Sequence, residues 1–242
     1  MTSAAVQLAH PQTTTRANGI VDHELPYETH NTYDVFLFGD SILTTVTHDG
    51  DIASQWISDV ESFHRSRLQH LIVGLDVEWR PSFNRYIQNP VATLQLSVGR
   101  RCLIFQLIYC SSIPTSLVDF LANPNYTFVG VGVSKDLEKL EEDYGFGYNT
   151  KTVDLRSLAA EAYGRKELKN AGVKELTRVV LEKELDKPKR VTMSRWDNQW
   201  LTPVQVRYAC VDAFVCFKIG RILNASSSSS AGASSSSASR RR

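Results

Sequence analysis

The sequence predicts an α/β domain, a mixed β-sheet flanked by helices. Strand-like apolar runs alternate with helical patterns along the chain, and 42% of the residues are hydrophobic, which is enough for a large core. With 242 residues, the chain has room for one substantial domain and short tails. We expect a flexible arm over residues 1–30, the domain over residues 31–223, and a disordered serine-rich tail over residues 224–242 that ends in three arginines.

The first half of the domain predicts a hairpin, a helix and three further strands. Apolar residues alternate on both sides of Gly39-Asp40, which is typical of a β-hairpin. Apolar spacing through Trp56 and Val60 predicts an amphipathic helix over Ile52–Leu68. In chain order the expected strands are Tyr33–Phe38, Ile42–Thr47, Leu71–Trp79, Ala92–Val98 and Cys102–Gln106.

The second half of the domain predicts mostly helices. Phe128–Val133 is a short apolar run, and Ser134 is expected to cap the helix that follows it as far as Tyr144. Thr202 as N-cap and Pro203 at the first helical position predict the start of the last helix. The other expected helices are Leu117–Leu121, Leu155–Tyr163, Val173–Leu181 and Thr202–Leu223.

Charge, cysteine and histidine content exclude several classes of site. Without the tail, 24 basic residues stand against 26 acidic ones, so any nucleic-acid site must be local. The four cysteines form no C-x-x-C pair, which excludes a zinc ribbon or redox motif. All six histidines precede residue 71, so chemistry in the rest of the chain uses no histidine base, Ser-His-Asp triad or HExxH site.

The N-terminus and the apolar runs predict the cellular compartment of the protein. The N-terminus lacks a signal peptide, and no run reaches the roughly 18 apolar residues of a membrane span. We therefore expect no membrane association and an intracellular protein with reduced thiols, in the nucleus, the cytoplasm or both.

Asp76 and Glu78 stand near the end of an otherwise apolar strand, Gly-Leu-Asp-Val-Glu-Trp. Charges in the interior are costly unless they are paired or bind a metal. The strand period of two places both carboxylates on one face, where they repel each other. A divalent cation would remove this repulsion, and a solvated acidic edge is the alternative interpretation.

Two further acidic residues lie on predicted helices. Asp136 follows Gly130-Val131-Gly132 in the first turn of its helix, where a capping role is the alternative. Tyr208 and Asp212 are four residues apart and share a face, with an aspartate bonded to a backbone amide as the alternative. The expected inward stripe of this last helix is Val204, Tyr208, Val211, Val215 and Ile219.

Together these motifs resemble the three exonuclease motifs of the DEDD superfamily. The matching segments are Gly-x-Asp-x-Glu-Trp at 74–79, Gly-x-Gly-x-x-x-Asp at 130–136, and Leu-Thr-Pro-x-Gln-x-x-Tyr-Ala-x-x-Asp-Ala at 201–213. A tyrosine four residues before the last aspartate is typical of the DEDDy branch. Over roughly residues 33–223 the chain resembles the Werner-syndrome-type exonuclease domain in its plant stand-alone form and, more distantly, ribonuclease D.

The resemblance implies a ribonuclease-H-like fold and a 3′-5′ exonuclease that hydrolyses single-stranded or 3′-end RNA or DNA to nucleoside monophosphates. It implies two Mg²⁺ or Mn²⁺ ions held by Asp76, which bridges them, and by Glu78, Asp136 and Asp212. Oxygen ligands suit these hard cations, which stabilise both oxygens of an in-line displacement. Tyr208 is then expected to orient the attacking water. The resemblance also suggests self-association, with a ring as one form.

Substrate contacts are expected beside these ligands, because a backbone or apolar wedge could seat the terminal base and aromatic rings could stack on it. Basic residues before the last motif could meet backbone phosphates, with a solvated loop as the alternative. The expected contacts are Leu75, Val77, Trp79 and Phe83 for the base, and Lys187, Lys189 and Arg190 for the phosphates.

Two functions other than catalysis fit the same fold. One is a non-catalytic module that binds nucleic acid, and the other is a subunit that recruits protein partners. The complete set of carboxylates together with Tyr208 favours catalysis, since a decayed site usually loses a ligand. The sequence leaves the choice between RNA and DNA open, because a 2′-hydroxyl is recognised by only a few contacts.

Overall fold

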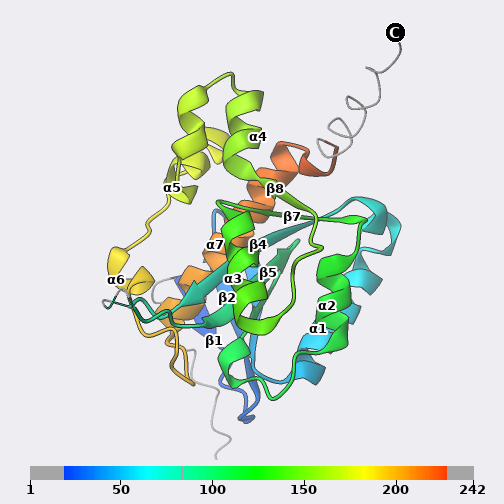
Figure 1. Cartoon of the computed structure of the whole chain (residues 1–242), viewed down its shortest axis with the longest axis vertical. Coiled ribbons are helices and arrows are strands. Elements are labelled where there is room, and N and C mark those ends of the chain that lie inside the picture. The colour runs from blue at the N-terminus through cyan, green and yellow to red at the C-terminus, as the bar shows by residue number, and fades with distance from the viewer. Residues whose placement is uncertain (1–18, 83, 85, 228–242) are drawn as a thin grey trace, which may run out of the picture.

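An eight-stranded mixed sheet forms the centre of the computed structural model, which describes residues 19–82, 84 and 86–227 (Figure 1). The strand order is β1-β2-β3-β6-β5-β4-β7-β8. The strands are β1 (Ile20–Asp22), β2 (His30–Leu37), β3 (Asp40–Thr47), β4 (Leu71–Trp79), β5 (Val91–Val98), β6 (Arg101–Phe105), β7 (Tyr126–Gly130) and β8 (Thr152–Asp154). This sheet with helices around it confirms the predicted fold class.

The pairing of the strands makes the sheet mixed and places β4 inside it. Strands β1 to β3 pair antiparallel, as do β4, β5 and β6, whereas β3 pairs parallel with β6, β4 with β7, and β7 with β8. The register between β4 and β5 shifts at Glu78 and Trp79, so the regular pairing of β4 ends at its acidic residues.

Helices cover both faces of this sheet (Figure 1). The α-helices of the described residues are α1 (Gly50–Phe63), α2 (Thr115–Ala122), α3 (Val133–Tyr144), α4 (Leu155–Ala162), α5 (Val173–Leu176), α6 (Lys189–Thr192) and α7 (Pro203–Ile222). Short 3-10 helices span Arg65–His70, Leu107–Tyr109 and Lys166–Asn170, and a π-helical turn spans Thr177–Leu181. Helices α1, α2 and α3 share one apolar core with the sheet, and α4, α5 and α7 share the other.

Helix α7 begins where its sequence predicts. The Thr202 hydroxyl accepts a hydrogen bond from the backbone N–H of Gln205, and the Gln205 side chain accepts one from the Thr202 N–H. This reciprocal capping satisfies two donors at the start of the helix, and Pro203 lacks the donor that would otherwise stay unpaired. The predicted inward stripe is wrong at Val204, which is 45% exposed.

Helix α7 lies directly against β4 because Gly74 has no side chain. A Cβ at Gly74 would lie 2.0 Å from the Ala213 carbonyl oxygen and 2.8 Å from the Phe217 nitrogen. From Gln205 to Gly220 most of the helix is buried on all sides rather than along one stripe. This close approach brings Asp212 of the helix next to the carboxylates of β4.

Several predicted boundaries differ from the structure. The helix predicted over Ile52–Leu68 is α1, Gly50–Phe63. Part of the predicted arm forms strand β1, because Ile20 packs into the core and pairs with Val35 of β2. Helix α3 begins at Val133 rather than after a Ser134 cap, because Gly132 (φ +80°) makes the turn and donates its N–H to Asp154. Ala225, in the predicted tail, is buried. The rest of the arm and tail, residues 1–18 and 228–242, lies outside the described residues.

None of the helices in the part of the chain that the structure describes is long and apolar enough to span a membrane. All four cysteines are free, and three of them are buried.

Candidate active site

Three carboxylates from two elements converge where β4 meets α7. One oxygen each from Asp76, Glu78 and Asp212 lies within 4.8 Å of the others. Asp212 is 3% exposed and Glu78 is 8% exposed, while Asp76 is half-buried. The prediction that Asp76 and Glu78 share one face of a strand is therefore confirmed, and Asp212 faces them from the helix.

The electrostatics of this cluster disfavour three ionised carboxylates side by side. Burial and then the repulsion from neighbouring carboxylates raise the pKa of Asp76 and of Glu78 well above their usual range. Burial also raises the pKa of Asp212, although Lys187 acts in the opposite direction. Oxygen donors in this arrangement suit a hard divalent cation, which would relieve the repulsion. The residues present therefore fit a divalent metal site.

Asp136 lies beside this cluster but outside its closest group. It occupies the first turn of α3 and is half-buried. Its charge raises the pKa of Asp76, which places it within electrostatic reach of β4. Burial, and then the charge of Asp154, raise the pKa of Asp136 to about 7. The structure thus brings all four predicted carboxylates to one region and groups three of them tightly.

Lys187 neutralises one of the carboxylates. Its Nζ lies 2.6 Å from Asp212 Oδ2 and 5.1 Å from the centroid of the Tyr208 ring. Burial lowers the pKa of Lys187, but the carboxylates of Asp212 and Asp76 outweigh burial and raise it. In this structure the lysine that was expected to meet substrate phosphates is therefore paired within the cluster.

The Tyr208 hydroxyl has a partner that the sequence did not indicate. It lies 2.8 Å from the Thr192 hydroxyl, at the end of helix α6. The Trp196 indole holds this segment in turn, because it donates a hydrogen bond to the Thr192 carbonyl and packs against the Tyr208 ring. Thr192 precedes Tyr208 by sixteen residues, and no spacing rule connects them. Only the path of the intervening loop brings the two hydroxyls together.

The predicted contacts with the terminal base need correction. Leu75 is 0% exposed and Val77 is 4% exposed, because the alternation of β4 turns both side chains into the core opposite the carboxylates. An apolar wedge from these two side chains is therefore wrong. Trp79 is 37% exposed, with Lys139 Nζ 5.4 Å from the centroid of its ring. Phe83 lies outside the described residues.

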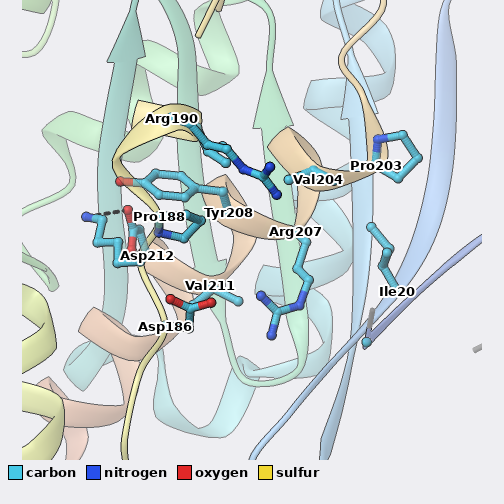
Figure 2. Close-up of a pocket in the computed structure, with 13 residues that line it drawn as sticks. Ile20, Asp186, Pro188, Arg190, Pro203, Val204, Arg207, Tyr208, Val211 and Asp212 are labelled. Atoms are coloured by element: carbon cyan, nitrogen blue, oxygen red, sulfur yellow. Dashed lines mark ion pairs between the residues drawn. The ribbon is translucent and has the colours of Figure 1, made fainter. Parts of the chain in front are cut away.

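The other predicted phosphate contacts lie on the surface near the site. Lys189 and Arg190 are both exposed in the first turn of α6. Arg190 also lines a pocket that Tyr208 and Asp212 border (Figure 2). These positions are compatible with contacts to a nucleic-acid backbone, which stay a prediction.

Comparison with known proteins gives consistent matches. A family model described as 3′-5′ exonuclease matches residues 46–226. A 3′-5′ exonuclease of Arabidopsis thaliana is 35% identical over 152 residues, which cover 62% of this chain and 52% of the relative. The mouse bifunctional 3′-5′ exonuclease/ATP-dependent helicase WRN is 33% identical over 144 residues, which cover 59% of this chain and 10% of WRN.

Among solved structures, Escherichia coli RNase D, described as an exoribonuclease involved in structured RNA processing, superposes with a TM-score of 0.61. It is 19% identical, and the match covers 77% of this chain and 45% of RNase D, so it shows a shared fold. The chain spans about half the length of the Arabidopsis relative and a small part of WRN.

Proposed function

The chain belongs to the 3′-5′ exonuclease family, and from this premise we propose that it is a metal-dependent hydrolase that shortens nucleic-acid strands from the 3′ end. The observation that carries this proposal is the convergence of Asp76, Glu78 and Asp212 within 4.8 Å, on the face of β4 that meets α7. Buried carboxylates at this spacing repel one another, so their presence favours a site built for cations rather than for stability.

Two divalent ions are part of the proposal. Asp76, Glu78 and Asp212 would hold one ion, and Asp136 beside them would complete the ligands of a second. When bound, Mg²⁺ or Mn²⁺ ions stabilise the negative charge that develops on the oxygens of the phosphate under attack. The carboxylates themselves fix where this stabilisation acts.

Tyr208 is proposed to orient the attacking water as a hydrogen-bond donor. Burial, and then the charge of Asp212, raise the pKa of Tyr208 to about 12, so its hydroxyl stays protonated at neutral pH and does not act as the base. If Thr192 donates its proton to the Tyr208 oxygen, the tyrosine proton can be donated to Asp212 or to the water. Thr192 is thus a positioning residue in this proposal.

The substrate proposal is a single-stranded or frayed 3′ end. The described part of the chain carries exposed basic residues near the cluster, Lys189 and Arg190, that could meet the backbone on either RNA or DNA. Self-association into a ring, and a location in the nucleus or cytoplasm, stay predictions that rest on the sequence. A non-catalytic binding or recruiting role is the alternative that the following experiment tests.

The experiment incubates the purified chain with 5′-labelled single-stranded RNA or DNA in Mg²⁺, Mn²⁺ or EDTA. We expect a ladder that shortens from the 3′ end, disappears in EDTA, and falls about 10³-fold or more in rate in Asp76→Asn, because several kcal/mol of charge stabilisation are lost. Asp119→Asn, an exposed aspartate on α2, is the matched control and keeps full activity. A folded protein that binds the strand but never shortens it would instead support the non-catalytic alternative.

A further inference from the structure

A pocket of about 500 Å³ opens beside the carboxylate cluster, along the first half of α7 (Figure 2). Tyr208 and Asp212 border one end, and Pro203 lies toward the other end with Ile20 of β1. Pockets that take small ligands measure roughly 300–1,000 Å³, so this one has room for a nucleotide. The pocket is therefore a second feature, which shares Asp212 with the carboxylate cluster.

Two unpaired guanidinium groups point into this pocket (Figure 2). Among the described residues, neither Arg190 nor Arg207 forms an ion pair. The Arg207 Nε is buried and has no hydrogen-bond partner there. A buried donor without an acceptor is unfavourable, so an acceptor from a ligand would satisfy it. Asp186, which is exposed, also lines the pocket, and Lys187 balances the charge of Asp212. The two arginines therefore outweigh the one remaining carboxylate, and the lining has a net positive charge.

The backbone of Gly19 packs Arg207 in place. A Cβ at Gly19 would lie 3.2 Å from the Arg207 Nε, and the residue has a φ of +74° that favours glycine. The guanidinium thus lies close to the Gly19 backbone, between β1 and α7, and Arg207 is half-buried. A confined donor loses less conformational entropy when an anion binds.

Apolar side chains form the remaining walls of the pocket. Ile20, Val191, Val204 and Val211 line it together with prolines from both sides. Val204 is 45% exposed in the first turn of α7, so its side chain is accessible from the pocket. Cationic groups beside apolar walls match the two parts of a nucleotide, its phosphate and its base or ribose.

We infer that this pocket binds one nucleotide, with the phosphate on Arg207 and Arg190 and the base or ribose against Val204 and Val211. The inference rests on the proposed function, because strand shortening supplies both a nucleotide at the strand end and a released nucleoside monophosphate. Both sources present the same chemistry to the pocket. The site differs from the carboxylate cluster in needing no metal ion.

The test measures binding of adenosine 5′-monophosphate by calorimetry in EDTA. We expect binding to the intact chain and to Asp76→Asn, and binding at least about tenfold weaker in Arg207→Gln, which corresponds to about 1.4 kcal/mol. Arg221→Gln, at the far end of the same helix, is the matched control and binds as the intact chain does. Adenosine, which lacks the phosphate, binds at least about tenfold more weakly.

A second pair of variants guards against a folding defect at Arg207. Val204→Glu places a negative charge in the pocket at a helix start, where acidic residues are tolerated, and should abolish binding. Ile222→Glu makes the same change about 27 Å away on α7 and should have no effect on binding. Competition between the monophosphate and a single-stranded oligonucleotide on Asp76→Asn would identify the strand end as the source, and simultaneous binding would identify the released product.

Two results would overturn the inference. The first is binding that requires Mg²⁺ and is lost in Asp76→Asn but not in Arg207→Gln, because it places the nucleotide in the carboxylate cluster. The second is the absence of binding in EDTA to the folded chain. Neither result bears on whether the chain shortens strands, and a chain that binds the monophosphate without shortening strands would contradict only the proposed function.

Discussion

Strand β4 packs one face against α1, α2 and α3 and the other against α7, and the two faces contribute different things to the protein. The residues of the first face are Leu71, Val73, Leu75 and Val77, all at most 4% exposed. The second face carries a glycine and two carboxylates at Gly74, Asp76 and Glu78. Burying the apolar face stabilises the fold, whereas burying the carboxylates destabilises it until a cation binds. One strand thus supplies stability on one side and chemistry on the other.

This difference predicts that substitutions on the two faces separate in their effects. Changes on the apolar face should lower stability and leave the chemistry of the folded molecules intact. Changes to the carboxylates should abolish the chemistry and leave the metal-free protein at least as stable. Gly74 is the exception, because it lies on the charged face yet determines how closely α7 approaches.

The largest expected effect on stability comes from Gly74→Ala. The new Cβ would lie 2.0 Å from a backbone oxygen of α7, which cannot move away without shifting the helix. We expect a loss of about 4 kcal/mol or more in the free energy of unfolding, measured by urea denaturation. Gly172→Ala is the matched control, since a Cβ there meets nothing within 4 Å, and should change stability by about 0.5 kcal/mol or less. Equal losses in the two variants would disprove the close packing of α7 on β4.

Leu75→Ala tests the apolar face next. Leu75 is fully buried, so its truncation removes buried surface and leaves a cavity that costs about 3 kcal/mol. The variant should unfold at lower urea concentration but still gain thermal stability from Mg²⁺, as the intact chain does. If it loses the gain from Mg²⁺ while still folded, the two faces of β4 are not independent.

A smaller effect, on rate rather than stability, is expected for Thr192→Ala. Without the Thr192 hydroxyl, Tyr208 loses the group that fixes its own hydroxyl, and the rate of strand shortening should fall about tenfold, the value of one modest hydrogen bond. Thr192→Ser keeps the hydroxyl and should restore most of the rate. A defect that serine does not restore would show that the threonine acts through packing alone.

The smallest expected effect concerns the two ion pairs of Asp40, which connect the β2–β3 hairpin to α7 and to the turn between β5 and β6. Lys218 Nζ lies 2.8 Å from one oxygen of Asp40, and Arg100 Nε lies 3.0 Å from the other. Burial raises the pKa of Asp40, but Lys218 and Arg100 together outweigh it and hold the pKa below its usual value.

The lowered pKa sets the sign of the pH dependence. The contribution of Asp40 to stability is present above the unfolded pKa of about 3.9 and is lost as the pH falls through the lower folded pKa. Asp40→Asn should therefore be less stable at pH 7 by about 1 kcal/mol or less, and the difference should vanish in acid. A difference that grows as the pH falls would contradict this assignment.

The parts of the site that lie within one element could be predicted from the sequence. The strand period alone places Asp76 and Glu78 on one face, and the Thr202-Pro203 start fixes where Tyr208 and Asp212 fall on α7. The close approach of α7 could not be predicted. It depends on Gly74 facing the helix backbone at Ala213 and Phe217, and this pairing is set by the tertiary fold.

Contacts that depend on the path of a loop were equally out of reach. The pairing of Lys187 with Asp212 and of Thr192 with Tyr208 joins residues that no helix or strand period relates. Strand β1 was also missed, since only Ile20 and Val21 mark it and its stability comes from pairing with β2. In each case tertiary packing, rather than local preference, decides the structure.

On this view of β4, the carboxylates on the α7 face are kept for divalent cations at a cost in stability. Thermal unfolding of the intact chain and of Asp76→Asn, each in EDTA and in saturating Mg²⁺, tests it most directly. We predict that Asp76→Asn is the more stable of the two in EDTA, because one repelling charge is removed. We also predict that only the intact chain gains from Mg²⁺, by about 2.7 kcal/mol when the ion is at a hundredfold excess over its dissociation constant. An equal gain from Mg²⁺ in both proteins, or a loss of stability on substitution in EDTA, would contradict a role of these carboxylates in cation binding.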